Sequence, residues 1–129
     1  MLDDAHSGST RLHLDVADAV NIMTYAGITA QGSRGFATWH IFARDDSDTI
    51  RQYLQARQTK KRVKGDPIHN QDTYITPVML AELRVQYGVR SYTVVQYPGD
   101  AVFIPAGCAH QVRNFPSSIA QRSCTSPSP

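Results

Sequence analysis

The chain has 129 residues, of which 41% are hydrophobic and 19% are charged, and its formal net charge is +2 at pH 7. This length suggests one domain with its own core, and the composition is ordinary for a soluble globular protein. The small net charge gives no argument for direct, sequence-specific nucleic-acid binding, and no apolar run approaches the ~20 residues that a membrane span requires. The two cysteines, Cys108 and Cys124, do not make a disulfide framework, so we expect two reduced thiols.

Three strands are predicted in the first third of the chain. Residues 11–16 alternate, with apolar side chains on one face and with His13 and Asp15 on the opposite face. Residues 19–26 and 36–43 are typical of a second and a third strand, and the third is largely apolar. Because side chains two positions apart on a strand project to the same side, this pattern brings the His13 imidazole close to the Asp15 carboxylate.

Two helices are predicted after these strands. Residues 45–58 have apolar side chains at helical spacing behind an acidic cluster, which suits a helix N-terminus. Thr76 followed by a proline indicates an N-cap, and Gly88 is typical of a helix C-terminus. The second predicted helix therefore covers residues 77–87.

Strands return after the second helix. Residues 91–97, 101–105 and 110–115 are rich in β-forming residues and are separated by the turns PGD and AGC. The last 14 residues are rich in Ser and Pro without a period, so we predict a domain over residues 1–115 and a disordered tail over residues 116–129. The pattern as a whole predicts a mostly β domain with an inserted helical pair, as in a barrel or jelly roll.

A candidate partner for His13 and Asp15 is His110, which follows a tight turn at the start of a late strand. A barrel would bring this imidazole opposite His13 and complete two histidines and one carboxylate on one side of a metal ion. Such a set leaves three positions open on a non-haem Fe(II), enough for a bidentate co-substrate and oxygen. On pattern alone, a histidine after a glycine turn is equally consistent with a capped or solvent-facing residue.

Five stretches, in order, resemble successive blocks of the Jumonji C (JmjC) domain: TRLHLDVADAVNIMTYAG, WHIFARDD, DPIHNQD, YGV and GDAVFIPAGCAHQVRN. They resemble in particular the histone lysine demethylase group that includes the hairless protein, over residues 8–114. The resemblance implies a cupin-like double-stranded β-helix. It also implies that His13, Asp15 and His110 are the ligands of an Fe(II) ion.

The same resemblance implies a pocket for the co-substrate 2-oxoglutarate. Thr10 matches a position that hydrogen-bonds the distal carboxylate of this molecule in several relatives. Asn21 falls where relatives place a polar residue of the same pocket, and an asparagine of a strand turn is an equal alternative. Many JmjC enzymes carry a lysine for the carboxylate on the third strand, where this chain has Ala37.

The activity implied by the resemblance is that of an Fe(II)- and 2-oxoglutarate-dependent dioxygenase that uses O2 to demethylate histone lysines. The family expectation is the mono- or dimethylated lysine at position nine of histone H3. The implied partner is the histone H3 tail in chromatin, and the implied location is the nucleus, with a role in transcription regulation. Two alternatives are a JmjC hydroxylase of protein side chains and a non-catalytic pseudoenzyme that acts as a chromatin interaction module.

Two departures from the family pattern lie at the ends of the sequence. Relatives have additional strands before the first iron ligand, and after the position of Asn114 they continue with a strand and an acidic EDF-like segment. Here the sequence after Asn114 reads FPSSIAQRSCTSPSP. We therefore expect a barrel that is incomplete at both ends, with some strand edges unpaired.

Overall fold

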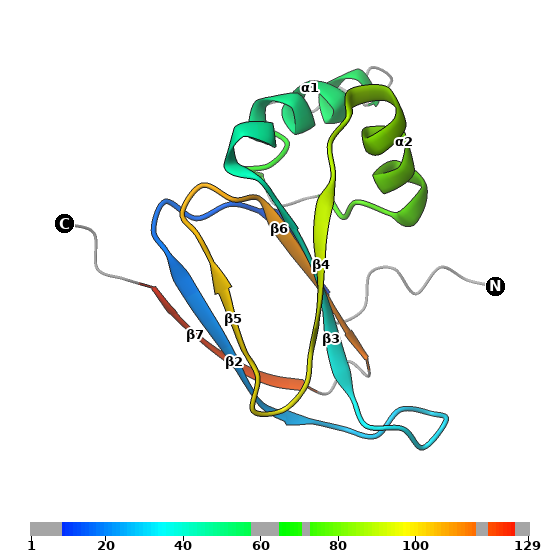
Figure 1. Ribbon diagram of the computed structural model, residues 1–129, viewed down its shortest axis with the longest axis vertical. Coiled ribbons are helices and arrows are strands. Elements are labelled where there is room, and N and C mark those ends of the chain that lie inside the picture. Colours follow the sequence, from blue (N-terminus) through cyan, green and yellow to red (C-terminus); the bar gives the residue numbers. More distant parts are fainter. Residues whose placement is uncertain (1–8, 58–64, 71–72, 116–118, 126–129) are drawn as a thin grey trace.

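The computed structural model describes residues 9–57, 65–70, 73–115 and 119–125, and within this part the chain forms two antiparallel sheets and two α-helices (Figure 1). The first sheet has the strand order β1 (Ser9–His13), β6 (His110–Phe115), β3 (Phe36–Phe42), β4 (Ser91–Gln96). The second has the order β5 (Ala101–Ile104), β2 (Ala19–Ala26), β7 (Ile119–Thr125). The prediction of a mostly β, cupin-like domain with an inserted helical pair is confirmed.

The two sheets face each other, and apolar side chains fill part of the space between them (Figure 1). Trp39 of β3 and Val112 of β6 project from the first sheet, and Met23 of β2 and Ile104 of β5 project from the second. This packing follows from the two-residue period of a strand, which sends alternate side chains to the inner face.

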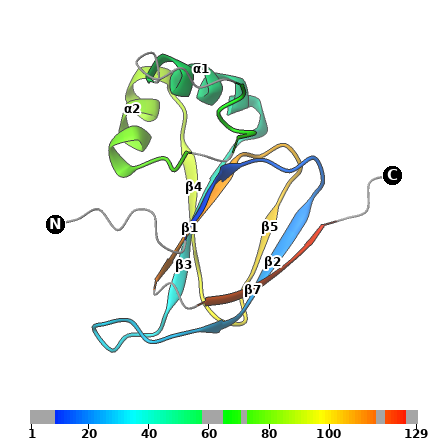
Figure 2. The same ribbon diagram turned by 180° about the vertical axis from the view of Figure 1, so that it is seen from behind.

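The helices cover one end of the first sheet (Figures 1 and 2). A 3-10 turn at Arg44–Asp46 leads into α1 (Ser47–Arg57), and α2 covers Pro77–Tyr87. The Thr76 hydroxyl accepts a hydrogen bond from the first turn of α2, and Gly88 ends the helix with a φ of 68°. No helix in the described ranges is long and apolar enough to cross a membrane.

A second apolar core lies between the helices and the sheet. Ile50 and Leu54 of α1 and Leu83 of α2 pack with Leu12 of β1 and Phe42 of β3. The ends of β1 and β3 are thereby fixed beneath the helices. The candidate metal ligands lie next to this fixed end of the sheet.

A polar contact joins the two helices at their exposed side. The Tyr53 hydroxyl donates to the Glu82 carboxylate, and Arg57 Nη1 donates to the same carboxylate oxygen at 2.7 Å. Burial and the bond to Glu82 raise the pKa of Tyr53 to about 12. Tyr53 therefore keeps its proton, and with it this contact, at physiological pH.

Gln96 connects the two sheets through a buried side-chain amide, and its relative exposure is 0%. Its Oε1 accepts hydrogen bonds from Trp39 Nε1 and from Gln121 Nε2, both at 2.8 Å. Its Nε2 donates to the main-chain oxygens of Asn21 at 3.0 Å and Asp100 at 3.1 Å. One buried residue of β4 thus satisfies polar groups on β3, on β2, on β7 and on the turn before β5.

The first strand is shorter than predicted. It ends at His13, and Asp15 lies in the loop that leads to β2. The turn before β6 holds this loop, because Gly107 N–H donates to the Asp15 carbonyl at 2.8 Å and Ala106 N–H donates to the Asp18 carboxylate at 2.7 Å. The prediction that the strand continues to Val16 is wrong, and Val16 is 89% exposed.

The structure also differs from the prediction of a disordered tail over residues 116–129. Ile119–Thr125 forms β7, which pairs with β2 so that Ser123 lies opposite Asn21. The edge of β2 offers unpaired main-chain donors and acceptors, and these can hold a strand that lacks apolar periodicity. Residues 116–118 and 126–129 lie outside the described residues.

Replacement of Gln96 tests how much the buried amide stabilises the packing of the sheets. Gln96→Leu leaves the buried Trp39 N–H without its partner and removes one donor from the main-chain oxygens of Asn21 and Asp100, of which Asp100 still accepts from Met23 N–H. A buried polar group that loses its partner and that no water can reach costs about 1–3 kcal/mol. We expect the free energy of unfolding, measured by urea denaturation, to fall by about 2–4 kcal/mol. Gln55→Leu, at an exposed position of α1, is the matched control and should change it by less than about 0.5 kcal/mol.

Candidate metal centre

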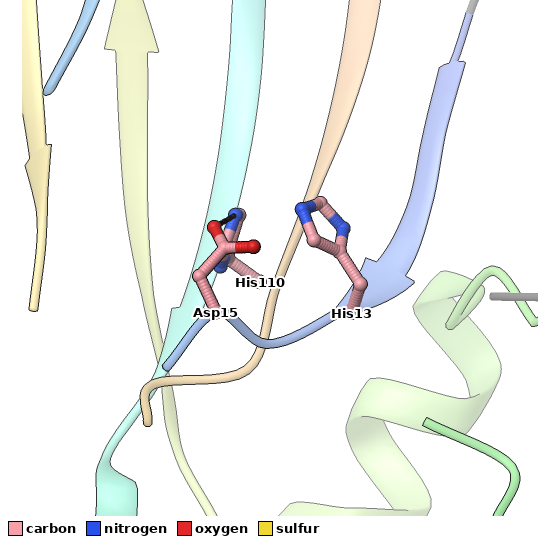
Figure 3. Close-up of side chains that lie close together, drawn as sticks. All are labelled: His13, Asp15 and His110. Atoms are coloured by element: carbon pink, nitrogen blue, oxygen red, sulfur yellow. Dashed lines mark ion pairs between the residues drawn. The ribbon is translucent and has the colours of Figure 1, made fainter. Parts of the chain in front are cut away.

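Strand pairing brings together two histidines that are far apart in the sequence. In the antiparallel pair of β1 and β6, His13 lies directly opposite His110. Their ring centroids are 4.2 Å apart. Figure 3 shows Asp15 reaching the same place from the loop after β1.

The three side chains converge on one point. One ligand atom from each of His13, Asp15 and His110 lies within 4.8 Å of the other two. His110 Nε2 lies 3.8 Å from Asp15 Oδ2, and this contact is drawn as a dashed line in Figure 3. The sequence-predicted triad is therefore brought together, although Asp15 comes from a loop and not from a strand.

Main-chain carbonyls set the tautomer of both histidines. His13 Nδ1 lies 2.8 Å from the Arg11 oxygen, and His110 Nδ1 lies 3.0 Å from the Cys108 oxygen. Since a carbonyl can only accept, the neutral form of each ring carries its proton on Nδ1 and has the lone pair on Nε2. This is the arrangement in which a histidine binds a metal while its other nitrogen is oriented by the protein.

Burial favours the neutral form of His110. Its side chain is 4% exposed, whereas that of Asp15 is 39% exposed. Burial lowers the pKa of His110, and His13 lowers it further, while the bond to Cys108 and the Asp15 carboxylate act in the opposite direction. The imidazole therefore stays neutral, and able to ligate a cation, to a lower pH than an ordinary histidine does. The ring of Trp39 lies beside it, nearly parallel, with a centroid distance of 6.0 Å and an interplanar angle of 23°.

A cavity of about 290 Å³ opens beside the triad, between the two sheets. Thr10 of β1 and Asn21 of β2, the two predicted cofactor-binding residues, line it from opposite sheets. Asn21 is in the middle of a strand and 6% exposed, so the alternative of a turn asparagine does not apply. The size suits a small organic molecule.

Strand β7 supplies a wall of this cavity that the sequence analysis missed. Gln121, Ser123 and Thr125 all line it. These residues alternate with Arg122 and Cys124, but both sets are short and largely polar, so no apolar period marks the strand. The spacing of the three residues is the only signal that could have indicated a strand.

Ala37 is fully buried on the inner face of β3, opposite Asn114 of β6 and Gln96 of β4. The place where many JmjC enzymes have a lysine therefore carries only a methyl group in this chain. None of the cavity-lining residues that the structure describes is a lysine or an arginine.

The donor set fits a divalent transition metal. Two neutral imidazole nitrogens and one carboxylate on one side of an ion are the facial set of non-haem iron sites, and they leave open positions toward the cavity. A purely structural zinc site would close the coordination shell with a fourth protein ligand, and the described residues offer only these three.

The sequence profile of the family described as "JmjC domain, hydroxylase" matches residues 6–123. The chain belongs to the JmjC domain family. The match includes all three residues of the triad and most of β7, so the strand that follows β6 lies within the JmjC region.

The curated JmjC relatives are lysine demethylases. The chain is 35% identical over 149 aligned residues to lysine-specific demethylase 3A of Gallus gallus, covering 91% of this chain and 11% of that protein. It is 37% identical over 146 aligned residues to lysine-specific demethylase 3 of Drosophila melanogaster, covering 87% of this chain and 17% of that protein. The chain thus spans only a small part of the length of these relatives.

Single replacements test the predicted ligands. His13→Ala or His110→Ala leaves two protein ligands, and we expect Fe(II) binding, measured anaerobically by calorimetry or metal analysis, to fall below detection. His69→Ala removes an exposed loop imidazole and should leave binding unchanged. Equal metal retention in all three variants would exclude this centre.

Proposed function

We propose that this chain is the catalytic region of an Fe(II)- and 2-oxoglutarate-dependent dioxygenase that removes methyl groups from histone lysines. The observation that carries the proposal is the convergence of His13, Asp15 and His110 beside a cavity between the sheets. The reaction class in this proposal comes from the relatives, which are named lysine-specific demethylases. The proposed substrate is the mono- or dimethylated lysine at position nine of the histone H3 tail.

The three ligands would hold the iron on one side and leave its other side open to the cavity. Bound iron supplies the redox chemistry with O2 and 2-oxoglutarate that yields succinate, carbon dioxide and an oxidised methyl group, which leaves the amine as formaldehyde. Trp39 keeps the His110 ring in position, and the main-chain carbonyls of Arg11 and Cys108 orient both imidazoles.

Thr10 and Asn21 would contribute the polar surface for the co-substrate. Thr10 stands on β1, three positions before the first candidate ligand, and the pairing of β1 with β6 is irregular between Thr10 and His13, so both residues line the same cavity. Asn21 accepts from Gln96 Nε2 at 3.1 Å and donates to Ser123 Oγ at 2.7 Å. These bonds fix the side chain of Asn21, so Asn21 acts chiefly by positioning Ser123 on the cavity wall that β7 forms.

Histone H3 in chromatin, O2 as the oxidant and a nuclear location complete the proposal. They follow from the activity that the relatives' names describe, and a role in transcription regulation follows from the substrate. A second candidate is hydroxylation of a protein side chain, which the family description "hydroxylase" favours. Both reactions would oxidise a C–H bond and would use the same triad.

Thr10 can be tested through the affinity for 2-oxoglutarate. Thr10→Val removes one hydrogen bond to a charged group, at about 1.5–3 kcal/mol, so the affinity should fall roughly tenfold to a hundredfold. Thr10→Ser keeps the hydroxyl and should bind nearly as the unaltered chain does. Calorimetric titration of the Mn(II)-loaded protein gives both values, and an unchanged affinity of Thr10→Val would place the carboxylate elsewhere.

The products that are released distinguish demethylation from hydroxylation. We expect the chain with Fe(II) and 2-oxoglutarate to release formaldehyde and succinate in equal amounts from an H3 peptide dimethylated at position nine. His110→Ala should release neither, and His69→Ala should be unaffected. Succinate with a peptide that gains one oxygen and no formaldehyde would favour the hydroxylase. Bound iron and 2-oxoglutarate without either product would contradict both enzymatic functions and favour a non-catalytic module.

A further inference from the structure

Groups that have only one hydrogen-bonding role fix the orientation of the Gln96 amide. Trp39 Nε1 can only donate, and it lies 2.8 Å from Gln96 Oε1. The main-chain oxygen of Asn21 can only accept, and it lies 3.0 Å from Gln96 Nε2. The Gln96 amide therefore has one possible orientation, with Oε1 toward Trp39.

This orientation determines the role of Ser123 on the cavity wall. Gln96 Nε2 shares its two protons among three oxygens, and Asn21 Oδ1 is one of them at 3.1 Å. A turned Asn21 amide would set two NH2 groups against each other, so the Nδ2 end of Asn21 faces Ser123. Asn21 Nδ2 donates to Ser123 Oγ at 2.7 Å. Ser123 thus accepts from the protein, and its own proton has no acceptor among the described residues. Since Ser123 lines the cavity, its O–H is left as a donor to a ligand.

The same orientation gives Gln121 the opposite role. Gln121 Nε2 donates to Gln96 Oε1 at 2.8 Å. Its Oε1 has no donor among the described residues, and Gln121 lines the cavity two positions from Ser123 on the same face of β7. The wall therefore offers a hydrogen-bond donor and a hydrogen-bond acceptor side by side.

We infer that the Ser123–Gln121 wall selects a small 2-oxo acid whose distal group is neutral and both accepts and donates, such as a carboxamide. This inference rests on the proposed function for the iron site and for a 2-oxo acid as co-substrate, and it departs from 2-oxoglutarate only in the distal group, which the wall accepts better as a neutral amide than as a carboxylate. It makes Ser123 and Gln121 specificity-determining residues and makes Asn21 and Gln96 positioning residues.

A distal carboxylate fits this wall less well. It can accept from Ser123, but it has no proton for Gln121 Oε1, and the two oxygens would repel each other. Turning the Gln121 amide would relieve that repulsion, but it would set Gln121 Oε1 against Gln96 Oε1, which Trp39 holds in place. The lining residues that the structure describes supply no ammonium or guanidinium group to balance the charge.

Two matched probes test the inference directly. N-oxalylglycine has the shape and both carboxylates of 2-oxoglutarate, with an N–H in place of one methylene group, and N-oxalylglycinamide has a carboxamide at the distal end. Calorimetric titration of the Mn(II)-loaded chain should show that the amide binds at least as tightly as the acid. An acid that binds more than tenfold tighter would overturn the inference and leave the proposed function standing. Binding of neither probe would overturn both.

Variants of β7 identify the residues responsible. Gln121→Lys replaces the acceptor by a cation and should reverse the preference, raising the affinity for N-oxalylglycine at least tenfold and lowering that for the amide. Ser123→Ala should lower the affinity for both probes about threefold to tenfold. Arg122→Ala is the control, because Arg122 is exposed and lies outside the cavity lining, and it should change neither affinity more than twofold. A selective loss of N-oxalylglycine binding in Arg122→Ala would show that this guanidinium anchors the carboxylate, and would overturn the inference.

Discussion

The candidate metal centre depends on the register between β1 and β6. His13 and His110 are opposite each other in this antiparallel pair, and a shift by one residue would turn one imidazole to the other side of the sheet. The helices help to hold this register, because Leu12 of β1 and Ala109, next to His110, belong to the apolar core beneath α1 and α2. The helical pair inserted between β3 and β4 thus stabilises the site without contributing a ligand.

Asp15 reaches the histidines by a different route. It lies in a loop, and the loop is held by hydrogen bonds from Gly107 and Ala106 in the turn that precedes β6. The turn that positions His110 therefore also positions the carboxylate. The turn at residues 105–108 thus holds two of the three candidate ligands in position. A working metal site requires support of this kind.

Hydrogen bonds between buried polar side chains connect the candidate metal centre to the far wall of the cavity. Trp39 packs on His110 and also orients Gln96, and Gln96 in turn orients Asn21 and Gln121. The Trp39 indole thus lies beside the candidate metal ligand His110 and also orients polar side chains on the far wall of the cavity. Membership of the JmjC family accounts for the triad, whereas the neutral wall is a property of the residues that this chain has on β7.

The sequence by itself determined the class of fold, the two helices and the three candidate ligands. Strand alternation, the Thr76 cap and the glycine turns are local signals, and the HLD and AGCAH stretches resemble a known family. Only the tertiary structure decided that Asp15 lies in a loop and that Ile119–Thr125 is a strand. The reason is that β7 is held by main-chain bonds to the edge of β2, which need no apolar pattern. The roles of Ser123 and Gln121 follow from hydrogen bonds to residues up to 102 positions away, and no local pattern records such partners.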